Sequence, residues 1–455
     1  MNPLIFREYD IRGMVGKDLT HDVVREIGRG YGTMMRNLGK KHITVGRDNR
    51  LSSKDFRDAI VEGILSTGID VTDCGLIPTP LLYFSLFHLP VDGGVQITGS
   101  HNPPEFNGFK LCVGKTTIHG KEIQHVREII ESGKLSQGKG ILKEYDIITP
   151  YLEMVKSKIK LNKKLKVVLD GGNGTSGLIA PKLLRDLGCE VTELYCNLDG
   201  NFPNHFPDPT VVKNLTDLIK KVKDEKADVG IGYDGDADRI GVVDNEGNII
   251  WGDQLMIIFA RDILKRKKGA KVVFEVKCSQ NLGNDIKKHG GIPIMWAAGH
   301  SLIKDKMLKE NAEFGGEMSG HIFFKDGYFG FDDAIYASLR LLLILSNTNQ
   351  KITEMLADVP KTFTTPEIRV DCPDEEKFEI VKKITADFKK EYDVIDIDGA
   401  RVIFNGGWGL IRASNTQPVL VVRFEAETEE KLEDFKKILY QRLNKFPALK
   451  SLKPF

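Results

Sequence analysis

The fold is read most directly from Lys166-Val167-Val168-Leu169-Asp170, a β-rich run that enters the glycine-rich turn Gly171–Gly177 and then a helical pattern through Leu187. Gly188 follows, as at a left-handed helix C-cap, and the apolar run Cys189-Glu190-Val191 comes next. A strand, a crossover helix and a further strand form the unit of a parallel or mixed α/β sheet. The stretch therefore predicts an α/β domain.

The same unit occurs three times along the chain. The other two copies are His42–Gly46 with a helix to about Ser66 and then Gly68, and Lys271–Glu275 with a helix to Lys288 and then Gly290. Each copy continues through a short apolar run into another strand of small residues. These last strands are Gly93–Thr98, Asp228–Tyr233 and Glu313–Gly316. Self-similarity of this kind indicates a repeated architecture.

A polar loop follows each of these last strands. The three loops are Thr98–Pro103, Asp234–Arg239 and Glu317–His321. In open α/β sheets, ligands bind beyond the carboxyl ends of the strands. Three equivalent loops therefore predict three domains that face one cleft.

The pattern changes in the C-terminal part of the chain. Arg401–Phe404 and Gly409–Arg412 have the composition of strands, and Asn405-Gly406-Gly407-Trp408 between them is a hairpin signal. Val419–Ala426 predicts another strand, and Glu429–Leu443 predicts an amphipathic helix. We expect a smaller antiparallel α+β domain here.

Size and composition exclude several classes of protein. The chain has 455 residues, of which 28% are charged and 41% hydrophobic, as in a folded protein. Its 65 basic and 64 acidic side chains give a net charge of +1, so we expect no nucleic-acid partner.

Met1–Gly13 lacks the layout of a signal peptide, and Tyr336–Leu345, which is about half a membrane span long, predicts a buried helix. Six scattered cysteines without a CxxC pair indicate reduced, mostly buried thiols in a cytoplasmic protein.

Three carboxylates alternate with small residues in the second loop, at Asp234, Asp236 and Asp238. A tight turn can bring them onto one hard cation, and Mg²⁺ fits best because it leaves positions open for phosphate oxygens. An EF-hand would need Gly and Glu where Arg239 and Asn245 stand. The alternative is a solvated acidic turn.

The first loop, Thr98-Gly99-Ser100-His101-Asn102-Pro103, is small, polar and prone to turn. Ser100 would sit among free backbone N–H groups that can bind an anion, and the adjacent His101 is a candidate base for a serine nucleophile. The hydrolase pattern Gly-x-Ser-x-Gly is absent. The alternative is an Asn-Pro turn with a chance serine.

Two further polar groups have the chemistry of a sugar-phosphate site. Glu317, Ser319 and His321 alternate, so on a strand-like segment they would face one way and bind neighbouring hydroxyls of a sugar. Arg412 begins a loop of short donors suited to a phosphate dianion, which is completed by Ser414, Asn415 and Thr416. The alternatives are satisfied core polar residues and a capped surface turn.

A dinucleotide fingerprint is also present. Gly172–Gly177 fits G-x-G-x-x-G between a strand and a helix. The acidic partner is uncertain, because Glu190 and Glu193 are only nearby, and the other two copies of the repeat lack the glycines. We therefore do not expect NAD binding.

Taken together, the loops resemble those of the α-D-phosphohexomutase superfamily, and within it the bacterial phosphomannomutase/phosphoglucomutase branch. The resemblance extends over essentially the whole chain. It rests on Tyr9–Gly13, on the serine loop with Asn107-Gly108-Phe109-Lys110, on Asp234–Arg239, on Gly316–His321 and on Arg412–Pro418.

This resemblance implies three similar α/β domains with mixed sheets plus a C-terminal α+β domain, arranged around a central active-site cleft. We expect domain I with the phosphoserine loop over residues 1–147 and domain II with the metal-binding loop over 148–250. Domain III with the sugar-binding loop would cover 251–362, and domain IV with the phosphate-binding loop 363–455.

The resemblance also implies an isomerase that is phosphorylated on Ser100, with Mg²⁺ held by Asp234, Asp236, Asp238 and a phosphoserine oxygen. By analogy, the phosphoserine passes its phosphoryl group to a hexose 1- or 6-phosphate, and the resulting hexose 1,6-bisphosphate, also the activator, returns the other one. The resemblance places Arg12, Lys110 and Arg239 at the transferring group, with Lys110 or His321 as acid or base. It places Glu317 and Ser319 at sugar O3 and O4, and it places the other phosphate at Arg412, Ser414, Asn415 and Thr416. Three further residues would line the cleft, namely Tyr9, Lys277 and His300.

The substrate class follows the resemblance as well. Met318 in the sugar loop resembles the mannose/glucose branch. The alternatives are a phosphoglucosamine mutase, a metal-dependent sugar phosphatase and a non-catalytic sugar-phosphate-binding protein. We expect small-molecule hexose phosphates as partners, no nucleic acid or membrane, and a monomer or weak dimer.

Overall fold

The computed structural model describes residues 1–415, 417–449 and 453–455, which fold around four β-sheets. The elements of the first sheet region are η1 (Pro3–Ile5), β1 (Ile11–Met14), α1 (His21–Asn37), β2 (His42–Arg47), α2 (Ser53–Leu65), β3 (Asp70–Leu76), α3 (Thr79–His88), β4 (Gly93–Ile97), β5 (Phe106–Val113), β6 (Thr116–Thr117), α4 (Lys121–Ser132) and β7 (Leu142–Glu144). Those of the second are α5 (Ile148–Lys158), β8 (Lys166–Asp170), η2 (Thr175–Leu178), α6 (Ala180–Asp186), β9 (Glu190–Leu194), η3 (Val212–Leu215), α7 (Thr216–Glu225), β10 (Val229–Tyr233), β11 (Ile240–Asp244) and β12 (Ile249–Ile250).

The remaining elements belong to the third and fourth sheet regions. Those of the third are α8 (Gly252–Arg266), β13 (Lys271–Glu275), α9 (Gln280–Lys288), β14 (Ile292–Trp296), α10 (His300–Glu310), β15 (Phe314–Gly316), β16 (Ile322–Phe324), α11 (Ala334–Ser346) and α12 (Ile352–Met355). Those of the fourth are β17 (Phe363–Thr364), β18 (Ile368–Asp371), α13 (Asp374–Phe388), β19 (Asp393–Ile395), β20 (Ala400–Phe404), β21 (Gly407–Ala413), β22 (Val419–Ala426), α14 (Glu429–Leu443) and η4 (Pro447–Leu449).

The first three sheets repeat one topology. In each, a central strand (β2, β8 or β13) has a parallel neighbour on both sides, namely β3 and β4, β9 and β10, or β14 and β15. The second of these neighbours then pairs with an antiparallel strand, β5, β11 or β16. The internal repeat and the mixed sheets predicted from the sequence are confirmed.

This topology places the three polar loops at equivalent positions. Each loop joins the last parallel strand of its unit to the antiparallel strand beside it: β4 to β5, β10 to β11, and β15 to β16. The glycines predicted as left-handed helix caps, Gly68, Gly188 and Gly290, have φ of 84°, 93° and 83°. The apolar segment near residue 340 forms α11, most of which is buried.

The fourth sheet has a different, antiparallel topology. Its strand order is β17-β22-β21-β20-β19, with β18 also paired to β22. The predicted hairpin forms, but its turn contains only Asn405 and Gly406, because Phe404 pairs with Gly407. Gly407 and Trp408 were wrongly predicted to lie in the turn. Gly406, with φ of 87°, allows the tight reversal, and Trp408 is buried in the sheet instead.

The hydrophobic clusters do not correspond one to one with the four sheet regions. One hydrophobic cluster extends from α3 of the first sheet region through the second and third regions to α11 and α12. The fourth region has a cluster of its own and meets the third mainly through Val276, Trp408 and Leu410. At this junction the buried Arg401 lies over the Trp408 ring, with its guanidinium carbon 3.7 Å from the centroid, and donates to the carbonyl of Cys278 at 2.8 Å.

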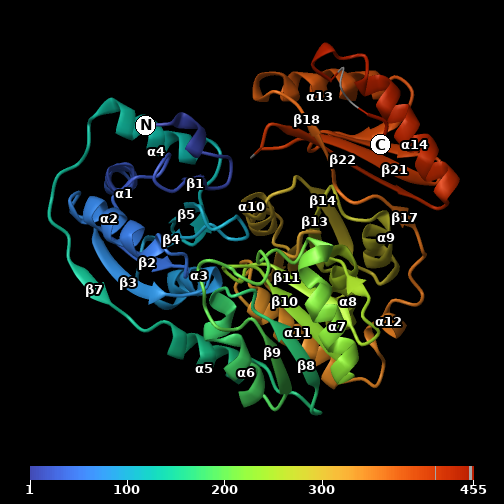
Figure 1. Cartoon of the computed structure of the whole chain (residues 1–455), viewed down its shortest axis with the longest axis horizontal. Coiled ribbons are helices and arrows are strands. Elements are labelled where there is room, and N and C mark those ends of the chain that lie inside the picture. Colours follow the sequence, from blue (N-terminus) through green and yellow to red (C-terminus); the bar gives the residue numbers. More distant parts are fainter. Residues whose placement is uncertain (416, 450–452) are drawn as a thin grey trace.

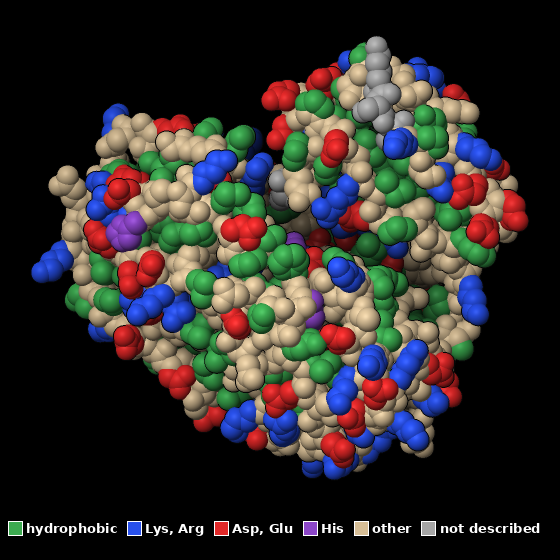
Figure 2. All heavy atoms as spheres, viewed as in Figure 1, with side chains coloured by type: hydrophobic (Ala, Val, Ile, Leu, Met, Phe, Trp, Pro, Cys, Tyr) green, Lys and Arg blue, Asp and Glu red, His purple; other side chains and the backbone are tan. Residues whose placement is uncertain are grey.

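The four sheet regions follow one another along an arc, so the first and the last face each other across a gap (Figure 1). The space-filling view shows a hollow between these two regions, with acidic and histidine side chains visible in its depth (Figure 2). All six cysteines are buried and unpaired. Among the described residues, no helix has the length and apolar character needed to cross a membrane.

Candidate active site

Ser100 lies in direct contact with the acidic loop of the second sheet region. Its Oγ donates to Asp234 Oδ2 at 2.7 Å and lies 3.1 Å from His101 Nδ1. The residue is only 2% exposed and has φ of 48°, a left-handed conformation that a residue with a Cβ adopts at an energetic cost. The two loops touch through their backbones, because a Cβ on Gly235 would lie 2.5 Å from the Ser100 carbonyl oxygen.

The three aspartates form a compact buried cluster. Asp234, Asp236 and Asp238 are fully buried, and each offers a carboxylate oxygen within 4.8 Å of the others. The alternative of a solvated acidic turn is therefore wrong. Burial and the two neighbouring carboxylates raise the pKa of Asp234 well above its ordinary value. Oδ1 of Asp236 and Oδ1 of Asp238 have no hydrogen-bond partner among the described residues, so the oxygens present fit a hard divalent cation.

Lys110 projects from β5 into this cluster. Its Nζ bonds to Asp238 Oδ2 and lies 3.4 Å from Asp236 Oδ2. Although burial lowers the pKa of Lys110, the nearby carboxylates outweigh it and raise this pKa above its ordinary value. Lys110 is thus held as an ammonium, which suits charge neutralisation better than proton abstraction.

Two arginines and one histidine complete this end of the site. Arg12 on β1 donates to Asn102 Oδ1 at 2.6 Å, next to the serine loop. Arg239 donates through Nε to His321 Nε2 at 2.9 Å, and the two residues also form a β-bridge that joins the second and third loops. Burial and the guanidiniums of Arg239 and Arg12 lower the pKa of His101 well below its ordinary value, so its imidazole is neutral. The loops therefore converge as the repeat predicts.

Arg50 shapes the serine loop, although sequence reasoning did not single it out. Its guanidinium donates to the carbonyl oxygens of Ser100 at 2.7 Å, Pro103 at 2.7 Å and Phe106 at 2.9 Å, and also to that of Asn102. Asp48 pairs with Arg50 Nε at 3.2 Å and accepts from Gly99 N at 3.2 Å. A signal existed, because both residues follow the strand His42–Arg47, at the edge of the sheet where the polar loops lie.

Replacement of Arg50 should disorganise the serine loop. Arg50→Met leaves several buried carbonyls and the Asp48 carboxylate without a partner, so we expect the melting temperature to fall by roughly 5 °C or more. We expect kcat to fall about 10- to 100-fold, because the loop no longer holds Ser100 in its position at the acidic cluster. Calorimetry and steady-state kinetics measure both. Arg25→Met, which removes ion pairs to the exposed carboxylates of Asp22 and Glu62, is the control. Equal effects of the two changes would contradict this role of Arg50.

The third loop is a turn and not a strand. Gly320 N donates to the Glu317 carbonyl at 3.0 Å, and Glu317 N donates to the His321 carbonyl at 2.9 Å. The prediction that Glu317, Ser319 and His321 alternate on a strand-like segment is therefore wrong. It rested on the alternation of residue types alone, whereas the backbone hydrogen bonds close this segment into a turn. The three residues still share one loop: Glu317 Oε1 accepts from Gly299 N at 2.7 Å, Ser319 is half-buried and His321 is buried.

Residues from three regions meet at the other end of the site. Asn415 Nδ2 donates to Tyr9 Oη at 2.6 Å, and Tyr9 Oη donates to the Ala298 carbonyl at 2.7 Å. Gly299 beside it has φ of 134°, and a Cβ there would lie 2.6 Å from the Tyr9 ring. His300, which begins α10, stacks on His321 with ring centroids 5.3 Å apart.

The end of β21 presents Arg412 beside this junction. Arg412 is 7% exposed, and its Nε donates to Asp398 Oδ2 at 2.8 Å. Ser414 is also buried, and its Oγ accepts from Gln417 N at 3.2 Å. Thr416 lies outside the described residues.

Lys277 is held by two carboxylates that the sequence did not point to. Its Nζ lies 3.1 Å from Glu367 Oε2 and 3.4 Å from Glu275 Oε2. Glu275 is fully buried, and this burial raises its pKa to about 7, although Lys277 lowers it. Its other oxygen accepts from Met318 N at 2.9 Å, so this pair holds the loop Glu317–His321 in place.

The dinucleotide fingerprint has a structural explanation. A Cβ on Gly174 would lie 2.7 Å from the Gly235 carbonyl oxygen, and one on Gly177 would lie 1.9 Å from that of Cys196. These glycines allow backbone to pack on backbone beside the acidic loop.

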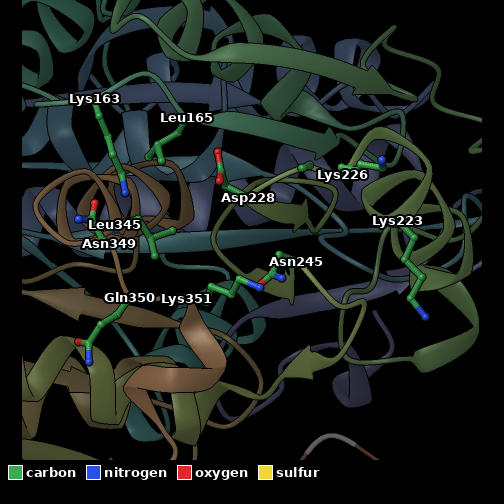
Figure 3. Close-up of a pocket in the computed structure, with 11 residues that line it drawn as sticks. Lys163, Leu165, Lys223, Lys226, Asp228, Asn245, Leu345, Asn349, Gln350 and Lys351 are labelled. Carbon is green, nitrogen blue, oxygen red and sulfur yellow. The ribbon is translucent and has the colours of Figure 1, made fainter.

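A cavity of about 360 Å³ lies away from the site. It is lined mainly by polar side chains near the ends of α7 and α11, among them Lys163, Asn245 and Lys351 (Figure 3). None of the predicted site residues lines it. The convergence of the loops, and not this cavity, identifies the candidate site.

Comparisons with known proteins match the chain over all four sheet regions. The family models for the α/β/α domains I, II and III of phosphoglucomutase/phosphomannomutase match residues 3–137, 149–247 and 251–363, and the model for the C-terminal domain matches 367–441. The chain is 47% identical over 440 residues to a phosphomannomutase/phosphoglucomutase of Pseudomonas aeruginosa, covering 96% of this chain and 95% of that one. It is 45% identical over 434 residues to a phosphoglucomutase of Neisseria gonorrhoeae, covering 94% of each.

A solved structure is similar over the whole fold. The crystal structure of a phosphoglucomutase/phosphomannomutase family protein from Burkholderia thailandensis matches with a TM-score of 0.93 and 41% identity. The match covers 99% of both chains.

Proposed function

The chain belongs to the phosphoglucomutase/phosphomannomutase family, and on this premise we propose that it interconverts the 1-phosphate and 6-phosphate of a hexose, either mannose, glucose or both. One observation carries the proposal: the Ser100 hydroxyl bonds to Asp234 within a buried cluster of three carboxylates. A nucleophile and a cation site in contact are the parts that phosphoryl transfer requires.

Ser100 carries the phosphoryl group in this proposal. When phosphorylated, it gives the group to the free hydroxyl of the sugar phosphate: the bond between phosphorus and Ser100 Oγ breaks, and one to the sugar oxygen forms. Arg12 beside the serine loop, Lys110 in the acidic cluster and Arg239 at His321 offset the negative charge on the group in transit. His101 positions Ser100 Oγ, and His321 is the better candidate for the hydroxyl proton because Lys110 is held as an ammonium.

Asp234, Asp236 and Asp238 would hold Mg²⁺, together with an oxygen of phosphorylated Ser100. Bound there, the ion supplies a Lewis acid that offsets charge on the transferring group. Lys110 neutralises part of the cluster's charge from β5. Hexose 1,6-bisphosphate is the intermediate and the activator that phosphorylates Ser100.

The opposite end of the site recognises the phosphate that is not transferred. Arg412, Ser414, Asn415 and Thr416 would bind it, while Glu317 and Ser319 bind the sugar hydroxyls and Tyr9, Lys277 and His300 line the space between. Since the bisphosphate must bind in two orientations, a fixed clamp at one end and a fixed nucleophile at the other serve both half-reactions.

Loss of the clamp should weaken substrate binding. A bidentate guanidinium–phosphate pair contributes about 1.5–3 kcal/mol, so Arg412→Ala should raise KM for glucose 1-phosphate roughly 10- to 150-fold. Steady-state kinetics measure this change. Lys389→Ala, which removes an exposed cation of the same region, is the control and should leave KM unchanged. An unchanged KM for Arg412→Ala would contradict the clamp assignment.

Phosphorus NMR tests the reaction itself. The protein is incubated with Mg²⁺, a trace of glucose 1,6-bisphosphate and, in separate tubes, mannose 1-phosphate, glucose 1-phosphate or glucosamine 1-phosphate. Growth of a 6-phosphate resonance with mannose or glucose supports the proposal, and the relative rates rank the hexoses. Turnover of glucosamine 1-phosphate alone would indicate an amino-sugar mutase. Release of inorganic phosphate alone would indicate a phosphatase, and no change would indicate a binding protein.

The remaining expectations complete the proposal. We infer that the four regions act as the phosphoserine, metal, sugar and phosphate domains, with the boundaries 1–147, 148–250, 251–362 and 363–455. Six buried, unpaired cysteines support a reducing, cytoplasmic setting. We expect hexose phosphates as the partners and a monomer or weak dimer.

A further inference from the structure

Asp332 is a buried carboxylate that the mechanism so far does not use. It lies just before α11 and is fully buried. Its Oδ1 accepts from Lys304 Nζ at 2.8 Å, and its Oδ2 lies 3.3 Å from His321 Nδ1 and 3.6 Å from His300 Nδ1. One carboxylate therefore faces His321, His300 and Lys304.

The contacts of His321 define which of its ring nitrogens carries the proton. Arg239 Nε donates to His321 Nε2 at 2.9 Å, and a guanidinium has no lone pair with which to accept in return. Nε2 must then present its lone pair, so the single proton of a neutral imidazole is on Nδ1.

Nδ1 in turn faces Asp332. Nδ1 of His321 and Oδ2 of Asp332 are both buried, and neither makes a hydrogen bond with another described residue. The next carboxylate oxygen, Asp238 Oδ1, is farther from Nδ1, at 3.6 Å. Because an unpaired buried donor and an unpaired buried acceptor are each costly, the proton on Nδ1 points to Asp332.

Lys304 keeps Asp332 in place and in its charged form. Lys304 and His300 are four residues apart on α10, so they lie on the same face of the helix. The Lys304 ammonium is buried over the Tyr83 ring, 4.0 Å from the centroid. Although burial raises the pKa of Asp332, Lys304 and the two histidines lower it well below its ordinary value.

We propose that Asp332 is a positioning residue for phosphoryl transfer: it holds His321 with its proton on Nδ1, so that Nε2 is free to accept the proton of the attacking sugar hydroxyl. The proposal rests on the proposed function, in which the sugar hydroxyl takes the place of Arg239 at Nε2. As the phosphoryl group leaves Ser100 Oγ and bonds to the sugar oxygen, the hydroxyl proton moves to Nε2. Asp332 stays ionised and stabilises the imidazolium that forms.

The kinetic test uses two neighbouring aspartates. Asp332→Asn can turn its amide N–H toward His321 Nδ1 and so favour the wrong tautomer. We expect kcat to fall about 10²- to 10⁴-fold while KM changes less than about threefold. Asp333→Asn is the matched control, because Asp333 is equally buried but bonds to Tyr151 and Tyr328 and caps α11. It should lower the melting temperature and leave kcat within about threefold. An unchanged kcat in Asp332→Asn would overturn the proposal.

A second variant distinguishes a loss of catalysis from misfolding. It is needed because Asp332→Asn leaves Lys304 buried without its ion-pair partner. The double variant Asp332→Asn/Lys304→Met removes both charges, and we expect it to fold and to show the same loss of kcat. Wild-type kcat in the folded double variant would overturn the proposal.

The tautomer is measured independently of activity by nitrogen NMR of histidine-labelled wild-type protein, with the His321 signals assigned from a His321→Asn sample. We expect a protonated Nδ1 and an unprotonated Nε2. A proton on Nε2 would overturn the proposal whether or not the protein is a mutase. An inactive wild-type protein with the expected tautomer would instead count against the proposed function.

Discussion

Ser100→Ala is expected to abolish the mutase reaction and to leave sugar-phosphate binding intact. Ser100 Oγ is the hydroxyl that faces the three-carboxylate cluster, and its loss removes the atom that carries the phosphoryl group in the proposed mechanism. Removal of a nucleophile should lower kcat by roughly 10⁴-fold or more. The Kd for glucose 1-phosphate, measured by calorimetry, should change by less than about threefold, because the phosphate clamp is untouched.

A buried serine elsewhere provides the control. Ser85 lies on α3 and, like many helical serines, donates to a backbone carbonyl in the preceding turn, in this case that of Leu82. Ser85→Ala should retain wild-type kcat. Turnover by Ser100→Ala at more than about one per cent of the wild-type rate would contradict the phosphoserine mechanism.

Asp234→Asn is expected to remove the response to Mg²⁺ while sparing the fold. An asparagine oxygen can still accept from the backbone N–H groups of Asp238 and Arg239, as Asp234 Oδ1 does at 3.0 and 3.1 Å. The cation, however, loses one anionic ligand. We expect kcat/KM to fall about 10²- to 10⁴-fold, and we expect the rise in melting temperature that Mg²⁺ produces in the wild type to disappear.

Kinetics and thermal melts with and without Mg²⁺ measure these effects. Asp228→Asn is the matched control at the other end of β10, where the carboxylate accepts from Lys166 N at 2.7 Å. It should retain the response to Mg²⁺. If Asp234→Asn melted at the wild-type temperature in Mg²⁺ and stayed active, the acidic loop would not be the metal site.

Much of the fold could be predicted because periodic patterns determine it locally. The predicted strand Lys166–Asp170 and helix Glu429–Leu443 coincide with β8 and α14. The repeat also predicts that the loops converge, because equivalent strands end at equivalent edges of their sheets. Where a short alternation of polar residues was the only guide, as from Glu317 to His321, the structure has a turn instead of a strand.

The residues that support the site were harder to predict, because their partners are distant in the sequence. Thr79 Oγ1 donates to Asp236 Oδ2 at 2.5 Å across 157 residues, and nothing around Thr79 indicates this contact. Asp398 likewise has no local pattern that relates it to Arg412. Loop composition indicates which side chains do chemistry, whereas the side chains that hold them are revealed only when the domains pack together.

Transfer of a labelled phosphoryl group tests the central claim most directly. The dephosphorylated protein is incubated with Mg²⁺ and ³²P-labelled glucose 1,6-bisphosphate, the labelled residue is identified by mass spectrometry, and the protein is then chased with unlabelled glucose 1-phosphate. The account predicts that the label enters on Ser100 and leaves as hexose bisphosphate and hexose 6-phosphate. Label on another residue, or label released only as inorganic phosphate, would contradict it.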